Sequence, residues 1–166
     1  MDRDKNLRVL FNEIAWMTKV INQVISSYLM HESAEKPDIQ ASVPDITESD
    51  SPYAKTVAEW ELNAYERLAL ALTMSTYLSP EALDVFFVKN QIYDRGFTEF
   101  GGMLAKDHSG FLPTGQTFNF LISALEKDRH SDVIRILSKE NILMKERVLN
   151  LSYTEDHISH YNGVLS

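Results

Sequence analysis

The 166-residue chain contains no cysteine, which excludes disulfides and thiolate metal sites. It also lacks a long apolar run. The longest stretch, residues 68–74, is far short of the roughly 20 residues that a membrane-spanning helix needs. No signal-peptide pattern follows the mixed charges of Met1-Asp2-Arg3-Asp4. These absences predict a cytoplasmic protein with no membrane partner.

Clustered lysine and arginine are missing as well, although nucleic-acid binding needs them to displace counterions from phosphates. The net charge is −8, and residues 31–66 hold nine acidic residues against two basic ones. Acidic segments with prolines are typical of solvated linkers, and Pro37 and Pro44 lie inside this one. The sequence therefore predicts an acidic linker over residues 32–51 and makes nucleic acid an unfavoured partner.

The first segment, residues 1–31, is predicted to be a long amphipathic helix. Over residues 4–30, apolar side chains recur in alternating steps of three and four, which is the a/d pattern of a heptad. These side chains are Leu7, Leu10, Ile14, Met17, Ile21, Val24 and Tyr28. Val9, Trp16 and Val20 widen the apolar face, which favours a helix packed on its own domain. Pairing with a second copy, as a homo-oligomer through the 4–30 helix, remains the alternative.

Helix start signals mark the next segments. Ser51-Pro52 places serine at an N-cap and proline in the first turn, which predicts a second long helix to about Leu78. Ser79-Pro80-Glu81 repeats the signal and predicts a short helix through Phe87.

Residues 88–115 combine many glycines with large apolar side chains. Five of the six glycines lie here, interleaved with phenylalanine, methionine and leucine. A disordered segment would be polar, so we expect a loop that folds back and packs its apolar side chains. We predict that residues 95–115 form the functional surface. The candidate interaction residues are its polar members Arg95, Glu99, Lys106, Asp107 and His108.

The C-terminal third predicts two helices and a hairpin. Thr114 or Thr117 can cap a helix to about Lys127, and a short helix follows over residues 131–138. Residues 142–149 are predicted as a strand, 153–162 as turn-rich and 163–166 as a second strand. This order is that of a winged-helix module.

The fold class is therefore mainly α with a small β-hairpin. It consists of a winged-helix-like domain over residues 52–166, preceded by the long N-terminal helix. Because the chain stops within the second hairpin strand, we expect it to be part of a longer protein.

Three motifs resemble catalytic or ligand-binding motifs, but each lacks residues or geometry that such a site needs. Residues 110–117 fit a phosphate-binding P-loop, except that Gln116 replaces the lysine, Pro113 removes a backbone N–H and no buried strand is predicted before it. Asp107-His108-Ser109 places three triad residue types side by side, where they cannot converge. His157 and His160 have metal-ligand spacing without further ligands. We therefore predict no catalytic residue, cofactor site or metal site in this chain.

Four segments follow one another in a distinctive order: Tyr65–Leu72, Leu78–Phe87, Arg95–Gly102 and Gly110–Thr117. This succession, over roughly residues 50–166, resembles the N-terminal region of a family of bacterial AAA+ ATPases. That family is well represented in Bacteroidetes and is associated with phage-tail-like contractile injection systems. The resemblance implies a winged-helix-like accessory region ahead of an ATPase module. It places ATP and Mg²⁺ in that module, because none of the family's ATP-binding residues maps onto this chain.

The leading interpretation is a non-catalytic interaction or regulatory domain of such an ATPase. It would bind a partner protein or the ATPase module of the same chain, or support motor assembly. The alternative is a winged-helix DNA-binding domain. The basic residues that could serve it are Lys127, Arg129, Arg135, Lys139, Lys145 and Arg147. Acidic residues interrupt them, at Glu126, Asp128, Asp132, Glu140 and Glu146. A third interpretation, a small enzyme built on the 95–117 loop, lacks a nucleophile or a metal.

Overall fold

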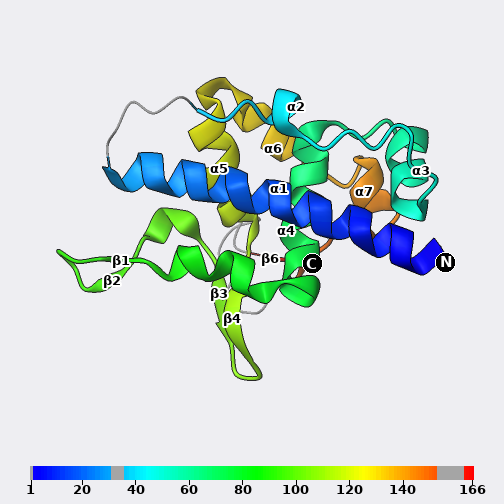
Figure 1. Ribbon diagram of the computed structural model, residues 1–166. Coiled ribbons are helices and arrows are strands. Elements are labelled where there is room, and N and C mark those ends of the chain that lie inside the picture. The colour runs from blue at the N-terminus through cyan, green and yellow to red at the C-terminus, as the bar shows by residue number, and fades with distance from the viewer. Residues whose placement is uncertain (1, 31–35, 153–162) are drawn as a thin grey trace.

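The computed structural model describes residues 2–30, 36–152 and 163–166. This part of the chain is mostly helical, with a long N-terminal helix and three two-stranded antiparallel sheets, in agreement with the predicted fold class (Figure 1). The α-helices are α1 (Asp2–Met30), α2 (Ile39–Ser42), α3 (Pro52–Glu59), α4 (Ala64–Leu78), α5 (Gly115–Leu125), α6 (His130–Ile136) and α7 (Ile142–Lys145). The 3₁₀ helices are η1 (Pro80–Phe87), η2 (Thr98–Phe100) and η3 (Lys127–Arg129). The strands are β1 (Lys89–Asn90), β2 (Arg95–Gly96), β3 (Met103–Ala105), β4 (His108–Leu112), β5 (Leu151–Ser152) and β6 (Val164–Leu165).

Helix α1 crosses the whole molecule and packs on α4, α3, α5 and η1 (Figure 1). The middle of its heptad pattern is buried in the chain's own core, at Ile14, Met17, Ile21 and Val24. This agrees with a helix packed on its own domain and leaves that face unavailable to a second copy. Only the ends of the pattern are more exposed, so a homo-oligomer contact there stays a prediction.

The segment predicted as a linker packs against the helices. Asp38 accepts hydrogen bonds from two backbone N–H groups at the start of α2, and the next residue, Ile39, is buried in the core. Arg67 of α4 donates a hydrogen bond to the carbonyl oxygen of Pro44 at 2.8 Å. The linker prediction is therefore wrong for residues 36–51, because apolar side chains spaced among the acidic ones anchor the segment. Residues 32–35 lie outside the described part.

A buried ion pair joins this segment to α1 and α4. The Glu13 carboxylate is fully buried and accepts hydrogen bonds from Arg67 Nε at 3.0 Å, from Arg67 Nη2, and from the Tyr53 hydroxyl at 2.8 Å. Burial disfavours the charged guanidinium, but the hydrogen bonds and charge of Glu13 outweigh it and raise the pKa of Arg67. Hydrogen bonds thus join α1, α3, α4 and the 36–51 segment at one buried polar cluster.

The helix predicted over residues 52–78 is two helices. Ser51 caps α3 as expected, but the chain turns at Glu61, whose φ is 51°. A capping box between Asn63 and Glu66 then starts α4. The prediction overlooked this second start signal because apolar spacing continues on both sides of the break.

The strand predicted over residues 142–149 is wrong. Asn141 caps the short helix α7 by accepting the backbone N–H of Leu143, and Arg147 has a left-handed φ of 55° that no strand allows. In the described residues after α7, strands β5 and β6 pair with each other, and Val164 of β6 also forms an isolated bridge with Thr114. Helices α5 and α6 are followed by a further helix, α7, and then by the antiparallel pair β5–β6, so α7 interrupts the predicted order of two helices and a hairpin. The predicted turn at 153–162 lies outside the described residues.

Candidate docking surface

Exposed apolar side chains gather at one end of the molecule. The β1–β2 hairpin projects beside the C-terminal end of α1, and the β3–β4 hairpin projects from the helical body below a more central part of that helix (Figure 1). Ile92, Tyr93 and Leu104 are 85%, 68% and 70% exposed, respectively. We define the hairpin surface as Tyr28, Leu29, Met30, Phe87, Ile92, Tyr93 and Leu104. Apolar side chains exposed together in this way mark binding surfaces more often than single exposed ones do.

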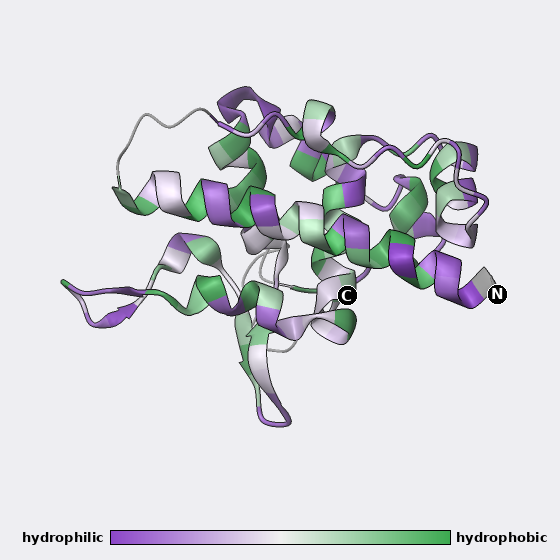
Figure 2. Cartoon of the chain, viewed as in Figure 1, coloured by the Kyte–Doolittle hydropathy of each residue, from purple (hydrophilic) through white to green (hydrophobic). Residues whose placement is uncertain are grey.

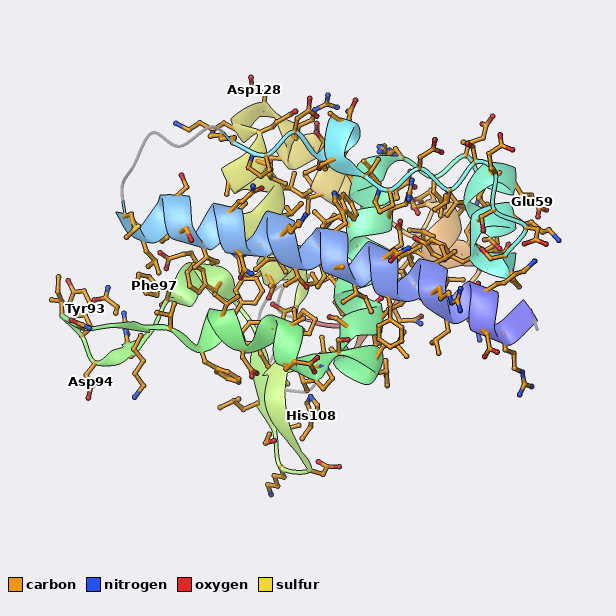
Figure 3. The ribbon with its side chains drawn as sticks, in the orientation of Figure 1. Glu59, Tyr93, Asp94, Phe97, His108 and Asp128 are labelled. Carbon is orange, nitrogen blue, oxygen red and sulfur yellow. The ribbon has the colours of Figure 1, made fainter. Side chains whose placement is uncertain are left out.

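The two hairpins differ at their tips. Most of the β1–β2 hairpin is hydrophilic and its far end is hydrophobic, whereas the tip of β3–β4 is hydrophilic (Figure 2). Tyr93 and Asp94 extend from the β1–β2 tip away from the helices, and His108 lies at the other hairpin (Figure 3). The exposed apolar side chains of the hairpins are therefore Ile92 and Tyr93 at the far end of β1–β2 and Leu104 on β3.

A cluster of aromatic rings fixes the base of both hairpins. Phe100 is buried, with ring centroids 4.7 Å from Phe120 and 4.9 Å from Phe97. Phe86 stacks on Phe111 at 4.9 Å. These separations are those of favourable aromatic pairs. As predicted, the 95–115 region packs its phenylalanines rather than exposing them, although it forms hairpins instead of a structureless loop.

Two glycines make this packing possible. Gly101 and Gly102 have φ values of 63° and 90°, in the region that favours glycine. A Cβ on Gly102 would overlap the Phe111 ring, and one on Gly101 would lie 2.6 Å from Thr114 Oγ1. The backbone therefore reverses beside a buried ring.

One predicted interaction residue ties the hairpins to α1. The Tyr28 hydroxyl donates a hydrogen bond to the Glu99 carboxylate, and this bond, with burial and the Glu99 charge, raises the pKa of Tyr28 to about 12. The Gln116 side chain donates to the Glu99 carbonyl oxygen at 3.3 Å. Glu99 therefore holds α1, η2 and α5 in position relative to one another.

An open groove of about 760 Å³ separates β1–β2 from the end of α1. Arg95 and Glu99 line it, together with Lys89, Ile92 and Tyr93. A second groove of about 300 Å³ lies between the two hairpins. Its walls are mostly apolar and include Phe86, Phe87, Phe97, Met103, Leu104 and Phe111.

The five predicted interaction residues divide between the hairpins. Arg95 and Glu99 both line the larger groove, whereas Lys106, Asp107 and His108 lie at the turn end of β3–β4 and line neither groove. Lys106 and Asp107 are exposed. His108 is half-buried, and its Nε2 atom is buried without a hydrogen-bond partner among the described residues.

The sequence analysis did not predict that apolar side chains form the hairpin surface, nor that Lys89 lines a groove. The run Asn90-Gln91-Ile92-Tyr93-Asp94 is polar at both ends and could have been identified as a hairpin tip. No sequence signal shows that Ile92 and Tyr93 point outward, because exposure depends on where the hairpin projects.

The segment that resembles a P-loop adopts another structure. Strand β4 overlaps the start of the segment: it contains Gly110 and the buried Phe111 and runs almost directly into α5. Thr114 and Thr117 cap the helix reciprocally, so their side chains take up the backbone N–H groups of Thr117 and Thr114. Little loop remains between strand and helix to surround a phosphate, and the segment carries no cationic side chain.

Within residues 2–30, 36–152 and 163–166, no three histidine, aspartate or glutamate side chains are grouped closely enough to hold a metal ion. The His157–His160 pair lies outside these ranges. None of the described helices combines the length and the apolar character needed to cross a membrane.

Comparison of the chain with protein-family models, with curated proteins and with solved structures finds no match. The resemblance to the AAA+ ATPase family therefore stays a prediction, and the geometry described above is the basis for a functional proposal.

Proposed function

We propose that this chain is a non-catalytic interaction domain of an AAA+ ATPase that docks a partner protein through the hairpin surface. The observation that carries the proposal is the exposure of Ile92, Tyr93 and Leu104 beside two grooves, on hairpins anchored in a packed aromatic cluster. Aromatic and apolar side chains held on a rigid base are the usual anchors of protein interfaces. The partner is a separate protein or the ATPase module of the same chain, and ATP and Mg²⁺ belong to that module.

The alternative, DNA binding by α6 as a recognition helix, has less support. Arg129 is paired with Glu126 at 2.6 Å and with Asp132 at 3.1 Å, and Arg135 lies 3.6 Å from Asp132. Binding DNA through these arginines would require breaking ion pairs within the protein, on a chain whose net charge of −8 repels phosphates.

The test uses the full-length protein, tagged at its own locus in its source cells. Ile92→Ser combined with Tyr93→Ser removes the exposed apolar tip, and Ile134→Ser on α6 is the matched control, because Ile134 is also exposed and apolar. We expect the hairpin variant to lose a co-purifying protein or its assembly into the ATPase complex, and the control to keep it. Equal retention by both variants would reject the proposal. An intact Walker A and B pair in the same reading frame would support the ATPase assignment.

A further inference from the structure

The segment that forms both hairpins, residues 87–112, carries no net charge, although the whole chain carries −8. Its three acidic and three basic side chains are Asp94, Glu99, Asp107, Lys89, Arg95 and Lys106. Residues 20–30, the C-terminal part of α1, contain no charged side chain. The hairpin surface is therefore electrically balanced and does not select an acidic or a basic partner.

The excess negative charge lies on the other side of α1. Residues 36–66 hold seven acidic side chains against two basic ones, and α2 and α3 of this segment lie across α1 from both hairpins (Figure 1). Two copies of the chain repel each other through that side. Approach through the hairpins keeps the acidic segments of the two copies apart, so two copies can meet there at little electrostatic cost.

The charges of β1–β2 suit an interface around a two-fold axis. Lys89 and Asp94 lie 4.0 Å apart, and both side chains are largely exposed. Such a pair is weak within one chain, so either side chain is able to meet an opposite charge elsewhere. Around a two-fold axis every contact occurs twice, with the roles of the two copies exchanged. Lys89 of each copy can therefore pair with Asp94 of the other.

Exposed apolar side chains and an apolar groove occur together on this surface, as self-association requires. The seven side chains of the hairpin surface are each more than a third exposed. They offer several hundred Å² of apolar area, which approaches the roughly 800 Å² per partner of a standard interface. The groove between the hairpins, of about 300 Å³, has the size of the smallest ligand pockets and suits apolar side chains. Ile92 and Tyr93 do not line this groove in their own copy.

We propose that a second copy of this chain covers the hairpin surface when no partner is bound. The far end of β1–β2 of each copy packs into the apolar groove between the hairpins of the other, and Lys89 and Asp94 pair across the two-fold axis. A partner protein displaces the second copy, so dimerisation regulates access to the docking surface. This regulatory role rests on the proposed function, whereas the dimer itself forms from the 166-residue chain alone.

Sedimentation velocity of the purified 166-residue chain tests the dimer, at concentrations from about 1 µM to 1 mM that span moderate and weak interfaces. We expect a reversible species of twice the 19.0 kDa chain mass, whose share rises with concentration. Ile92→Ser combined with Tyr93→Ser should keep the chain monomeric. Ile134→Ser is the matched control and should dimerise like the parent, because Ile134 is exposed on α6 and lies outside the hairpins.

A charge exchange between two variants identifies the contact. Lys89→Asp and Asp94→Lys should each weaken the homodimer by about tenfold, because each change turns two attractions into two repulsions. Mixed in equal amounts, the two variants should form a heterodimer about as stable as the parent dimer, since opposite charges then meet at both contacts. Both side chains are largely exposed, so each variant should melt like the parent.

A chain that stays monomeric over the whole concentration range would overturn the proposal. A dimer that survives Ile92→Ser with Tyr93→Ser would also overturn it, as would a mixture of the charge variants that forms no heterodimer. Each of these results leaves the proposed function standing, because that function is measured by a co-purifying protein in the source cells. A dimer of the purified chain without any co-purifying protein would instead count against the proposed function alone.

Discussion

The buried Glu13–Arg67 pair gives the sharpest stability prediction. Arg67→Met keeps an apolar stem of similar length but removes two of the three hydrogen bonds that Glu13 accepts, leaving only the Tyr53 hydroxyl. Glu13 is fully buried, so its carboxylate is left without a compensating charge. Breaking one partner of such a pair costs about 3–5 kcal/mol of unfolding free energy. For a domain of this size that lowers the melting temperature by roughly 6–20 °C.

Urea unfolding followed by the fluorescence of Trp16 and Trp60 measures this cost. Glu13→Leu combined with Arg67→Met is the control, because replacing both ions by apolar groups is often close to neutral. We expect the double variant to lose less stability than Arg67→Met alone. A loss below about 1 kcal/mol for Arg67→Met, which is the value of an exposed pair, would refute the reasoning.

Three further predictions concern the hairpins and α6. Gly102→Ala should unfold at a clearly lower temperature in calorimetry, because its φ of 90° and the Phe111 ring exclude a Cβ, whereas Gly96→Ala should melt like the parent. In an alkaline titration followed by tyrosinate absorbance, Tyr28 should ionise near pH 12, and Glu99→Gln should move it toward the ordinary value of 10.0. Since the folded state keeps that proton while the unfolded chain loses it, unfolding free energy should fall as the pH rises from about 10 to 12. A labelled DNA duplex should show no saturable anisotropy change at about 150 mM salt, and nanomolar, sequence-specific binding would contradict the ion-pair interpretation of α6.

Local signals in the sequence predicted much of the helical fold. Heptad spacing located α1, and the caps at Ser51 and Thr114 located two helix starts. Prediction failed where tertiary contacts decide the structure. Residues 36–51 are acidic and contain two prolines, yet Ile39 and the Arg67–Pro44 hydrogen bond fix them to the core. Sequence composition alone cannot show a hydrogen bond between positions that far apart.

The sequence predicted roughly where the candidate surface lies, but not that apolar side chains form it. Residues 95–115 were selected for their glycines and phenylalanines, and Arg95 and Glu99 do line the larger groove. The exposed apolar side chains lie partly before that range, at Phe87, Ile92 and Tyr93. Two short hairpins produce this exposure, and strands of two to five residues are too short to leave a clear periodic pattern in the sequence.

The most direct test of the central claim is photo-crosslinking from the hairpin surface. A benzophenone amino acid is placed at position 93 of the full-length protein in its source cells, and the same amino acid at position 134 serves as the control. Both positions are exposed. The account predicts one discrete crosslinked product from position 93 and none from position 134. Equal crosslinking from both positions, or from position 134 alone, would contradict a docking role for the hairpins.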